Sequence, residues 1–411
     1  MTSLNTVPGY KALLAARCTS SVALWLDFTL IFSLLSYHWH ADAITIGMSS
    51  ALYGLPGLVL GPFLGSLADR RNPLMMLVIS YLARGVTSVL LIVAPDLQLF
   101  VLLVLIKGIA NLGAMPAEQI LIRSMLNKEQ LVSNASVMTA VDQFTKICAP
   151  LAAAGLTGLY RPATGLGLSA ALAMVGILCL PALRRVALAR AQQMVTGRSK
   201  WHYGPLLQLV RENRRFRQAF VCVLWLTAIL GLYDPQLSLF LKEEGMPAAV
   251  FGMIVSFTAG GALAGALAFR TLHRRYGRHL PSGGLVAFGL TVLLPGGLAA
   301  GGVAIPLPLW LALWVANGCA YGLTAMSFGV TLQQESPAEA VGTVSAAARS
   351  AQLGALVLGP LLGASMAGLL GIPLVFVLSG SLAVIGGAVM LWRTQGRKDL
   401  VVGQAGSAEH P

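Results

Sequence analysis

The chain has 411 residues, of which 56% are hydrophobic and only 10% are charged, yet its formal net charge is +13. A soluble globular protein usually carries about 25% charged residues, so this composition excludes a cytosolic enzyme, a disordered chain and a secreted disulfide scaffold. The five cysteines lie in or beside apolar runs with no paired spacing, and we therefore expect neither disulfides nor a zinc site.

Twelve apolar segments are long enough to cross a membrane as helices, because a span needs about 20 mostly apolar residues. In chain order, the expected spans are 12–36, 43–67, 74–95, 98–120, 135–158, 163–183, 218–241, 248–270, 282–304, 309–331, 343–367 and 372–392. The first of them follows a basic start, but it is longer than the core of a signal peptide and lacks a clear cleavage site. It is either a signal anchor or simply the first helix, and the sequence predicts an all-α membrane protein.

The positions of Lys and Arg predict the orientation of these spans, because the cytoplasmic loops of membrane proteins are enriched in both residues. If the N-terminus is cytoplasmic, only Arg161 and Lys242 fall in outside loops. The connection 184–217 carries nine Lys and Arg against a single acid, Glu212. We therefore expect both termini in the cytoplasm, and we expect 201–217 to form an interfacial helix on anionic lipid.

The basic connection divides the chain into two halves of six spans that repeat one another. Gly, Gly, Leu, Ala and Arg recur at a constant offset of 200 residues between 61–70 and 261–270, and Pro150 matches Pro360 at an offset of 210. Such parallel six-helix repeats are typical of secondary transporters. The expected domains are an N-terminal six-helix half, a cytoplasmic basic linker, a C-terminal six-helix half and a cytoplasmic tail, at 1–183, 184–217, 218–392 and 393–411.

The end of the second span resembles a signature of the major facilitator superfamily. It reads Gly65-x-Leu67-Ala68-Asp69-Arg70-Arg71, against G-x-L-A-D-R in the family. The resemblance covers essentially the whole chain. It implies twelve transmembrane helices in two pseudo-symmetric halves, and a transporter that works by alternating access.

Three further features resemble the bacterial branch of drug and siderophore exporters, which includes macrolide and enterobactin exporters. They are Asp27 late in the first span, the Pro116-Ala117 step, and Leu131-x-Ser133-Asn134. This resemblance implies secondary active export of a small organic molecule (a drug, a siderophore or a metabolite) by proton antiport across the bacterial plasma (inner) membrane. The alternative is an importer or a lipid-carrying facilitator of the same fold.

The chain departs from the family motifs at three places. Asn72-Pro73 stands after Arg71, where the motif continues with Gly and a base, and Phe269 replaces the motif acid in the second half. The antiporter signature ends in Gly-Pro, which here reads Ala149-Pro150 in the fifth span and Gly359-Pro360 in the eleventh. We therefore expect only the gate of the first half to use a carboxylate.

The candidate cytoplasmic gate consists of Gly65, Asp69, Arg70 and Arg71. Because glycine lets helix backbones approach closely, Gly61 and Gly65 would pack the second span against the eleventh, and Gly261 and Gly265 the eighth against the fifth. Asp69 would then lie beside a neighbouring helix, with the two arginines available for pairing, and would hold the cytoplasmic side closed. The alternative is a solvated turn that only follows the orientation rule.

Away from their ends, the expected spans contain six ionisable residues, in a region where charges are costly and usually functional. Three are acids and three are bases, and we expect them to pair: Asp27, Arg84, Lys107, Asp142, Lys146 and Asp234. The candidate proton-coupling residues are Asp27, Asp234 and Asp142, because a carboxylate shielded from water binds a proton more readily. The alternatives are a structural hydrogen bond for Asp27, an extracellular hinge for Asp234, and a salt bridge to Lys146 for Asp142.

The candidate substrate-cavity residues combine positive charge with polar and aromatic surface: Lys107, Lys146, Asn317, Tyr321 and Tyr233. Lys107 would bind an anionic group of the substrate or pair with Asp27, whereas Arg84 would tie neighbouring helices together. The aromatic residues suit an amphipathic organic substrate, but they are also ordinary anchors at membrane interfaces.

The sequence points away from catalysis. It contains no nucleotide-binding G-x-x-x-x-G-K-[ST] motif, its six histidines are scattered or in loops, and His38-x-His40-x-Asp42 is too short a pattern to predict a metal site. We therefore expect no enzyme activity, cofactor or metal. The expected partners are a small-molecule substrate, protons and membrane lipids, with no nucleic acid, and we expect a monomer.

Overall fold

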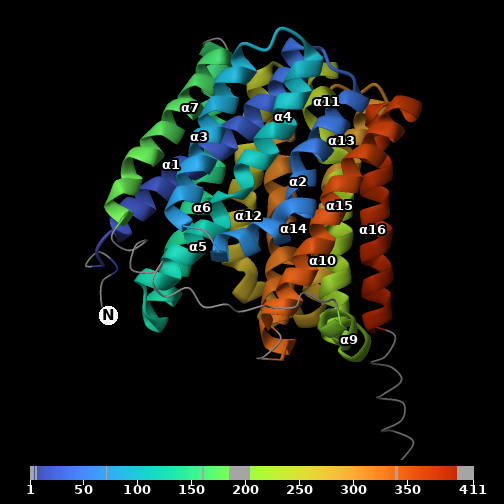
Figure 1. Ribbon diagram of the computed structural model, residues 1–411. Coiled ribbons are helices and arrows are strands. Elements are labelled where there is room, and N and C mark those ends of the chain that lie inside the picture. Colours follow the sequence, from blue (N-terminus) through green and yellow to red (C-terminus); the bar gives the residue numbers. More distant parts are fainter. Residues whose placement is uncertain are drawn as a thin grey trace, which may run out of the picture. The chain divides into compact units, whose positions relative to one another are not determined.

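The computed structural model describes residues 4, 7–70, 72–159, 162–184, 204–337 and 341–395, and within these ranges every regular element is a helix (Figure 1). The described helices belong to two compact units. The first unit contains α1 (Tyr10–Ser33), the π-helical η2 (Leu34–His38), α2 (Ala43–Arg70), α3 (Pro73–Ile92), α4 (Leu97–Leu112), α5 (Ala114–Met125), α6 (Lys128–Leu159), α7 (Pro162–Cys179), η3 (Leu180–Leu183), α11 (Leu237–Glu243) and the beginning of α12.

The second unit contains the remaining helices. They are α9 (Gly204–Glu212), α10 (Arg214–Tyr233), the rest of α12 (Ala248–Tyr276), η5 (Gly277–His279), α13 (Leu280–Ala300), α14 (Leu307–Glu335), α15 (Val341–Leu370) and α16 (Ile372–Gln395). The short 3-10 helix η4 (Asp234–Gln236) follows α10 directly, and its residues from Pro235 onward group with the first unit.

Each of the twelve expected spans coincides with a helix, or with helices joined end to end, in the part of the chain that the structure describes. By length and hydropathy, 10 described segments can cross a membrane, and one of them, Ala248–Ala300, holds both α12 and α13. α6 is not among the ten, although it is 32 residues long. The protein is therefore an all-α, multi-pass membrane protein.

Two of the expected spans are interrupted. Gly113 separates α4 from α5 within the expected span 98–120, and η4 separates α10 from α11 within 218–241. The second break follows from Pro235, because proline has no backbone N–H to continue the helical hydrogen bonds. Each segment was expected as one span, with an interruption of the helical hydrogen bonds expected at Pro235 alone.

Three of the described helices begin at a side-chain cap. Asn72 accepts a hydrogen bond from the backbone N–H of Leu74 at 2.9 Å, with Pro73 in the first turn of α3. Asp96 and Asn213 cap α4 and α10 in the same way. The Asn72-Pro73 departure from the family motif is thus a strong start signal for α3.

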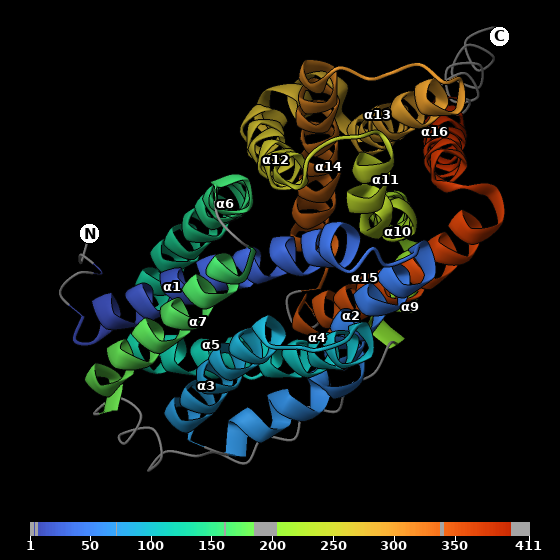
Figure 2. The ribbon, with the colours of Figure 1, turned by 90° about the horizontal axis from the view of Figure 1, so that it is seen from above.

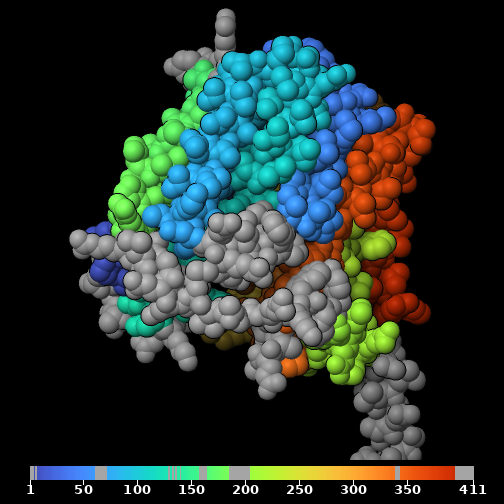
Figure 3. Space-filling model, in the orientation of Figure 1, coloured from blue at the N-terminus to red at the C-terminus, as the bar shows by residue number. Residues whose placement is uncertain are grey.

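The surface of the first unit is apolar where an ordinary soluble protein would be polar. On α3, the large apolar side chains Met75, Ile79, Leu82, Val86 and Val89 are exposed, whereas Ser80, Tyr81, Arg84, Thr87 and Ser88 are buried. The exposed residues of α3 and α4 form one continuous surface in Figure 3. This inverted distribution suits contact with lipid on the outside and hydrogen bonding inside.

Within the first unit, α1 packs against α6 and α7, and α3 packs against α4 and α7, as Figures 1 and 2 show. Side chains along the length of α1 therefore face the interior of this unit. In the second unit, α13 packs against α14 and α16, while α10 packs against α14, α15 and α16. These contacts carry the polar clusters described below.

The glycines of α12 face a different helix from the one that the sequence analysis expected. A Cβ atom on Gly261 or Gly265 would collide with the backbone of Val315 or Cys319 on α14, so these glycines pack against the tenth span and not the fifth. Likewise, a Cβ atom on Gly318 of α14 would collide with the backbone of Thr258 on α12. The expectation for Gly261 and Gly265 was wrong because a glycine face does not specify its partner.

Two other close contacts involve the pattern that resembles the antiporter signature. Gly359 and Gly363 of α15 lie against the backbone of Gly231 and Leu232 of α10. In the first unit, α12 approaches α6, the fifth span, at Gly252, whose missing side chain makes room for the Pro150 carbonyl group. Small residues therefore permit close helix approach on α15 and on α12.

Several expected features lie outside the described residues. They are Arg71, most of the linker (185–203) and most of the tail (396–411). In the described part of the expected interfacial helix 201–217, α9 ends at Glu212 and α10 begins at Arg214, so the segment is two helices. Leu206, Leu209 and Val210 of α9 pack into an apolar cluster with Phe216 and Val344 of the same unit.

Candidate functional site

The most deeply buried charges are Asp27 on α1 and Lys107 on α4. The Lys107 ammonium nitrogen lies 2.7 Å from Asp27 Oδ2, and the pair is inaccessible to solvent. Ser88 of α3 donates a hydrogen bond to Asp27 Oδ1 at 3.1 Å and accepts one from Lys107. Lys107 also donates to the Arg84 carbonyl oxygen at 2.7 Å. Of the alternatives for Lys107, the pair with Asp27 is therefore present.

Arg84 ties α3 to α1, as the sequence analysis expected. Its guanidinium group donates to Ser20 Oγ at 2.6 Å and to the Ser20 carbonyl oxygen at 2.7 Å. The side chain is buried, so the bonds to Ser20 replace water around a charged group.

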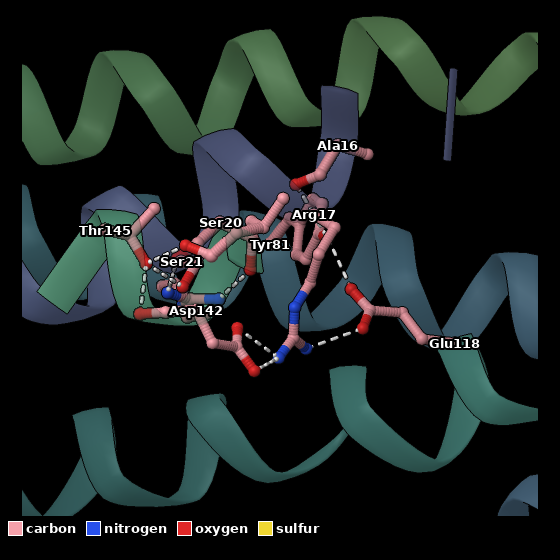
Figure 4. Close-up of polar contacts among 10 residues, drawn as sticks. Ala16, Arg17, Ser20, Ser21, Tyr81, Glu118, Asp142 and Thr145 are labelled. Carbon is pink, nitrogen blue, oxygen red and sulfur yellow. Dashed lines mark hydrogen bonds and ion pairs between the residues drawn. The ribbon is translucent and has the colours of Figure 1, made fainter. Parts of the chain in front are cut away.

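A second cluster centres on Arg17 of α1, which lies between two carboxylates (Figure 4). Arg17 Nη1 donates to Glu118 Oε2 of α5 at 2.7 Å. Arg17 Nη2 donates to Asp142 Oδ1 and Oδ2 of α6 at 2.8 and 3.1 Å. The Tyr81 hydroxyl group lies 3.2 Å from Glu118 Oε1 and 3.2 Å from the Ala16 carbonyl oxygen, and it can donate to one of them at a time.

Sequence reasoning missed Arg17 and Glu118 as site residues. Arg17 was counted among the positive charges of the cytoplasmic side, and Glu118 was excluded because it lies near the end of the expected span 98–120. Both nevertheless fall inside expected spans, and an ionisable residue within a span is a functional candidate. Counting charges up to the last turn of each span would have found them.

The two clusters are linked through α3. The Arg84 guanidinium carbon lies 5.9 Å from the centre of the Tyr81 ring, and the Tyr81 hydroxyl group contacts Glu118. With all groups ionised, Asp27, Lys107 and Arg84 sum to one positive charge, and the Arg17 cluster sums to one negative charge. The charges therefore sum to zero across the two linked clusters. The residues of these clusters are not the same six as those counted in the sequence.

Lys146 of α6 lies near an aromatic ring of α1. Its ammonium nitrogen is 5.5 Å from the centre of the Trp25 ring, a distance suited to a cation–π interaction. One turn earlier, Asp142 uses both of its oxygens to accept from Arg17. The structure thus gives Asp142 a partner from another helix, while its pairing with Lys146 stays a prediction from the spacing.

In the second unit, the candidate residues gather where α10 ends. Asn317 of α14 donates to Thr291 Oγ1 of α13 at 2.9 Å and to the Tyr233 hydroxyl oxygen at 3.4 Å. Asp234 follows Tyr233 directly at the start of η4 and interacts electrostatically with Tyr321, one turn beyond Asn317. Tyr233 is buried, whereas Tyr321 is 36% exposed. The structure thus brings Asp234, Tyr233, Asn317 and Tyr321 together.

The candidate gate is only partly described. Gly65, Asp69 and Arg70 occupy the last turns of α2, whose backbone is helical to Arg70, and Arg71 lies outside the described residues. The pairing expected of Asp69 and the arginines stays a prediction.

The short His38-x-His40-x-Asp42 pattern serves structural contacts. His40 Nδ1 lies 2.6 Å from Lys242 Nζ, and Asp42 Oδ1 accepts the backbone N–H of Thr45 at 2.9 Å. Hydrogen bonds from the side chain and then the backbone of Thr45 hold the pKa of the Asp42 carboxyl group below its usual value. Over the described ranges, no three His, Cys, Asp or Glu side chains are placed to hold a metal ion.

Comparison with solved structures shows the fold. A nucleoside transporter, NupG, has a TM-score of 0.70 at 17% identity, covering 93% of this chain and 98% of that chain. A bacterial homologue of the iron transporter ferroportin in an inward-facing state has a TM-score of 0.68 at 18% identity, covering 93% of this chain and 98% of that chain.

Comparison of sequences gives the family. An uncharacterized MFS-type transporter, YfiS of Bacillus subtilis (strain 168), is 26% identical over 394 residues, which is 93% of this chain and 92% of that protein. The family model described as Major Facilitator Superfamily matches residues 13–353, which is most of the chain. The chain belongs to the major facilitator superfamily and is a membrane transporter.

Proposed function

We propose that the protein is a secondary active transporter that exports a small organic molecule, such as a drug, a siderophore or a metabolite, by alternating access coupled to proton antiport. We place it in the bacterial inner membrane with both termini in the cytoplasm, because Lys and Arg concentrate in the loops that this orientation makes cytoplasmic.

One observation carries the coupling part of the proposal, namely the inaccessible Asp27–Lys107 pair. A carboxylate in this position is stable only while its partner or a proton neutralises it. If Asp27 takes up a proton when the transporter opens to one side, Lys107 is released to other acceptors. If Asp27 loses that proton on the other side, the pair forms again. Such an exchange would couple proton movement to the change in access.

The other candidate residues fit supporting roles. Asp142 and Asp234 are further proton-coupling candidates, and Lys146, Asn317, Tyr233 and Tyr321 would contact the substrate. Asn317 is already oriented by Thr291 and Tyr233, so its amide is positioned before any substrate arrives. The gate of Gly65, Asp69, Arg70 and Arg71 would close the cytoplasmic side.

The experiment that tests this proposal is flux in proteoliposomes under an imposed pH gradient, with a chemically diverse panel that includes siderophores. We expect one class of compound to move against a proton gradient, and we expect Asp27→Asn to lose proton-driven flux while it retains exchange of labelled for unlabelled substrate. Wild-type transport in Asp27→Asn would remove Asp27 from coupling. If the compound instead moves in the same direction as the protons, the protein is an importer.

A further inference from the structure

The Arg17 cluster contains one more negative charge than positive charge. One guanidinium group serves two carboxylates, with Nη1 on Glu118 at 2.7 Å and Nη2 on Asp142 at 2.8 Å. A single proton on either carboxyl group would make the cluster neutral. Because one guanidinium group holds both carboxylates, a proton on either of them leaves Arg17 paired with the other.

The surroundings tolerate both protonation states. From α1 the carboxylates meet Arg17 and the Cys18 thiol, from α3 they meet Tyr81 and Arg84, and α7, which also packs on α6, has no charged residue. Lys146 lies one turn along α6 from Asp142. When no proton is bound, the extra negative charge is balanced by the one net positive charge of Asp27, Lys107 and Arg84, to which Tyr81 links the cluster. When a proton is bound, the cluster is neutral by itself.

The two carboxyl groups differ in their access to water. The Asp142 side chain is 35% exposed, whereas the Glu118 side chain is 5% exposed. Both Glu118 oxygens have a donor on another helix, Arg17 or Tyr81, while the two Asp142 oxygens share one nitrogen of Arg17. A proton can therefore enter and leave through Asp142.

We propose that Arg17, Glu118 and Asp142 form one proton-binding site that takes up a single proton, shared by the two carboxyl groups and exchanged with water through Asp142. Protonation of Asp142 weakens its bond to Arg17 and leaves Arg17 with Glu118. This removes one contact between α6 and α1. The Ser21–Thr145 hydrogen bond of 2.8 Å, the Tyr10–Asn134 hydrogen bond of 3.0 Å and the Lys146–Trp25 contact remain. As a second proton-binding site beside Asp27, this site has a role in transport only if the proposed antiport holds.

The site is testable without a substrate, by infrared difference spectroscopy of the full-length protein in lipid during a pH titration. The carbonyl stretch of a protonated carboxyl group gives a separate band. Among the bands that wild type gains as the pH falls, we expect one to come from this site and to shift rapidly in D2O. We expect both Asp142→Asn and Glu118→Gln to lose it, because Arg17 with one remaining carboxylate is already neutral.

Two further variants make the result specific. Asp142→Glu retains both carboxyl groups and should retain the band, which distinguishes loss of the site from loss of the fold. Glu212→Gln removes an exposed acid of α9, whose partner is Gln208, and should leave the band unchanged. Persistence of the band in either Asp142→Asn or Glu118→Gln would overturn the shared site, as would its absence from wild type.

The outcome for this site can be separated from the outcome for antiport. If wild type shows the band but moves no protons with any compound, the site stands and the proposed antiport fails. If wild type couples protons to substrate flux and both Asp142→Asn and Glu118→Gln keep the band, antiport stands and the shared site fails.

Discussion

Lys107 Nζ lies 2.7 Å from Asp27 Oδ2, and the two residues have no surface exposed to solvent. The pair joins α4 to α1, and Ser88 of α3 bonds to both members. Three helices of the first unit therefore meet at two opposite charges. Because each charge is compensated only by the other, removal of one should cost more than removal of both.

We expect Lys107→Met to be strongly destabilising. It fills a similar volume but leaves Asp27 charged and buried, and breaking a buried pair in this way costs about 3–5 kcal/mol. Thermal unfolding of the purified protein in detergent measures the loss. The double variant Asp27→Asn/Lys107→Met should regain part of it, since no isolated charge is left. If the loss in the double variant equals the sum of the losses in the two single variants, the residues do not interact energetically.

A pair of adjacent glycines on α12 provides a matched test of helix packing. Gly261→Ala places a methyl group against the Val315 backbone, and overpacking of this kind costs about 1–3 kcal/mol. A methyl group on Gly260 meets nothing within 4 Å, so Gly260→Ala should be neutral or gain up to about 1 kcal/mol from helix propensity. Unfolding temperatures compare the two variants directly. Equal effects would mean that α12 and α14 can separate without loss.

The spans could be predicted from the sequence because length and hydropathy decide whether a segment crosses a membrane. The breaks at Gly113 and Asp234 could not be placed in the same way. A proline such as Pro235 permits either a kink or a new helix, and the choice depends on the packing around it. The starts of α3, α4 and α10 were readable, since Asn72, Asp96 and Asn213 bond to backbone groups only two or three residues away.

The candidate site was predictable in its residue types but less so in its pairings. Asp27 and Lys107 stood out as charges inside spans, and their pairing was one of two alternatives. Arg17 and Glu118 were missed, since the rule that assigns basic residues to the cytoplasmic side applies equally to a buried arginine near a helix end. The partner of Asp142 comes from α1, 125 residues away in sequence, and spacing along α6 carries no information about it.

The orientation can be tested with reporter fusions. We expect alkaline phosphatase fused after Gly245, between α11 and α12, to be active, because the enzyme folds only outside the cytoplasm. The same reporter fused after Asn127, between α5 and α6, should be inactive. A fluorescent protein at the C-terminus should fold and emit. The reverse pattern would place both termini outside and would invert the direction of export.

Asp42, which caps α2, predicts a pH dependence of stability. Its Oδ1 accepts the Thr45 N–H, and the resulting lowered pKa means that the stabilising contribution is present above the unfolded pKa and is lost as the pH falls through the folded one. Near neutral pH, Asp42→Asn should be close to wild type, while Asp42→Ala should lose about 1 kcal/mol because alanine cannot cap.

Below the ordinary aspartate pKa of about 3.9, wild type should lose stability relative to Asp42→Asn, whose amide oxygen accepts at every pH. Unfolding temperatures of the three proteins at neutral and acidic pH measure this difference. Parallel curves for wild type and Asp42→Asn across that range would show that the charge of Asp42 contributes nothing to its capping bond. Because the residue is exposed, the effect should also shrink at high salt.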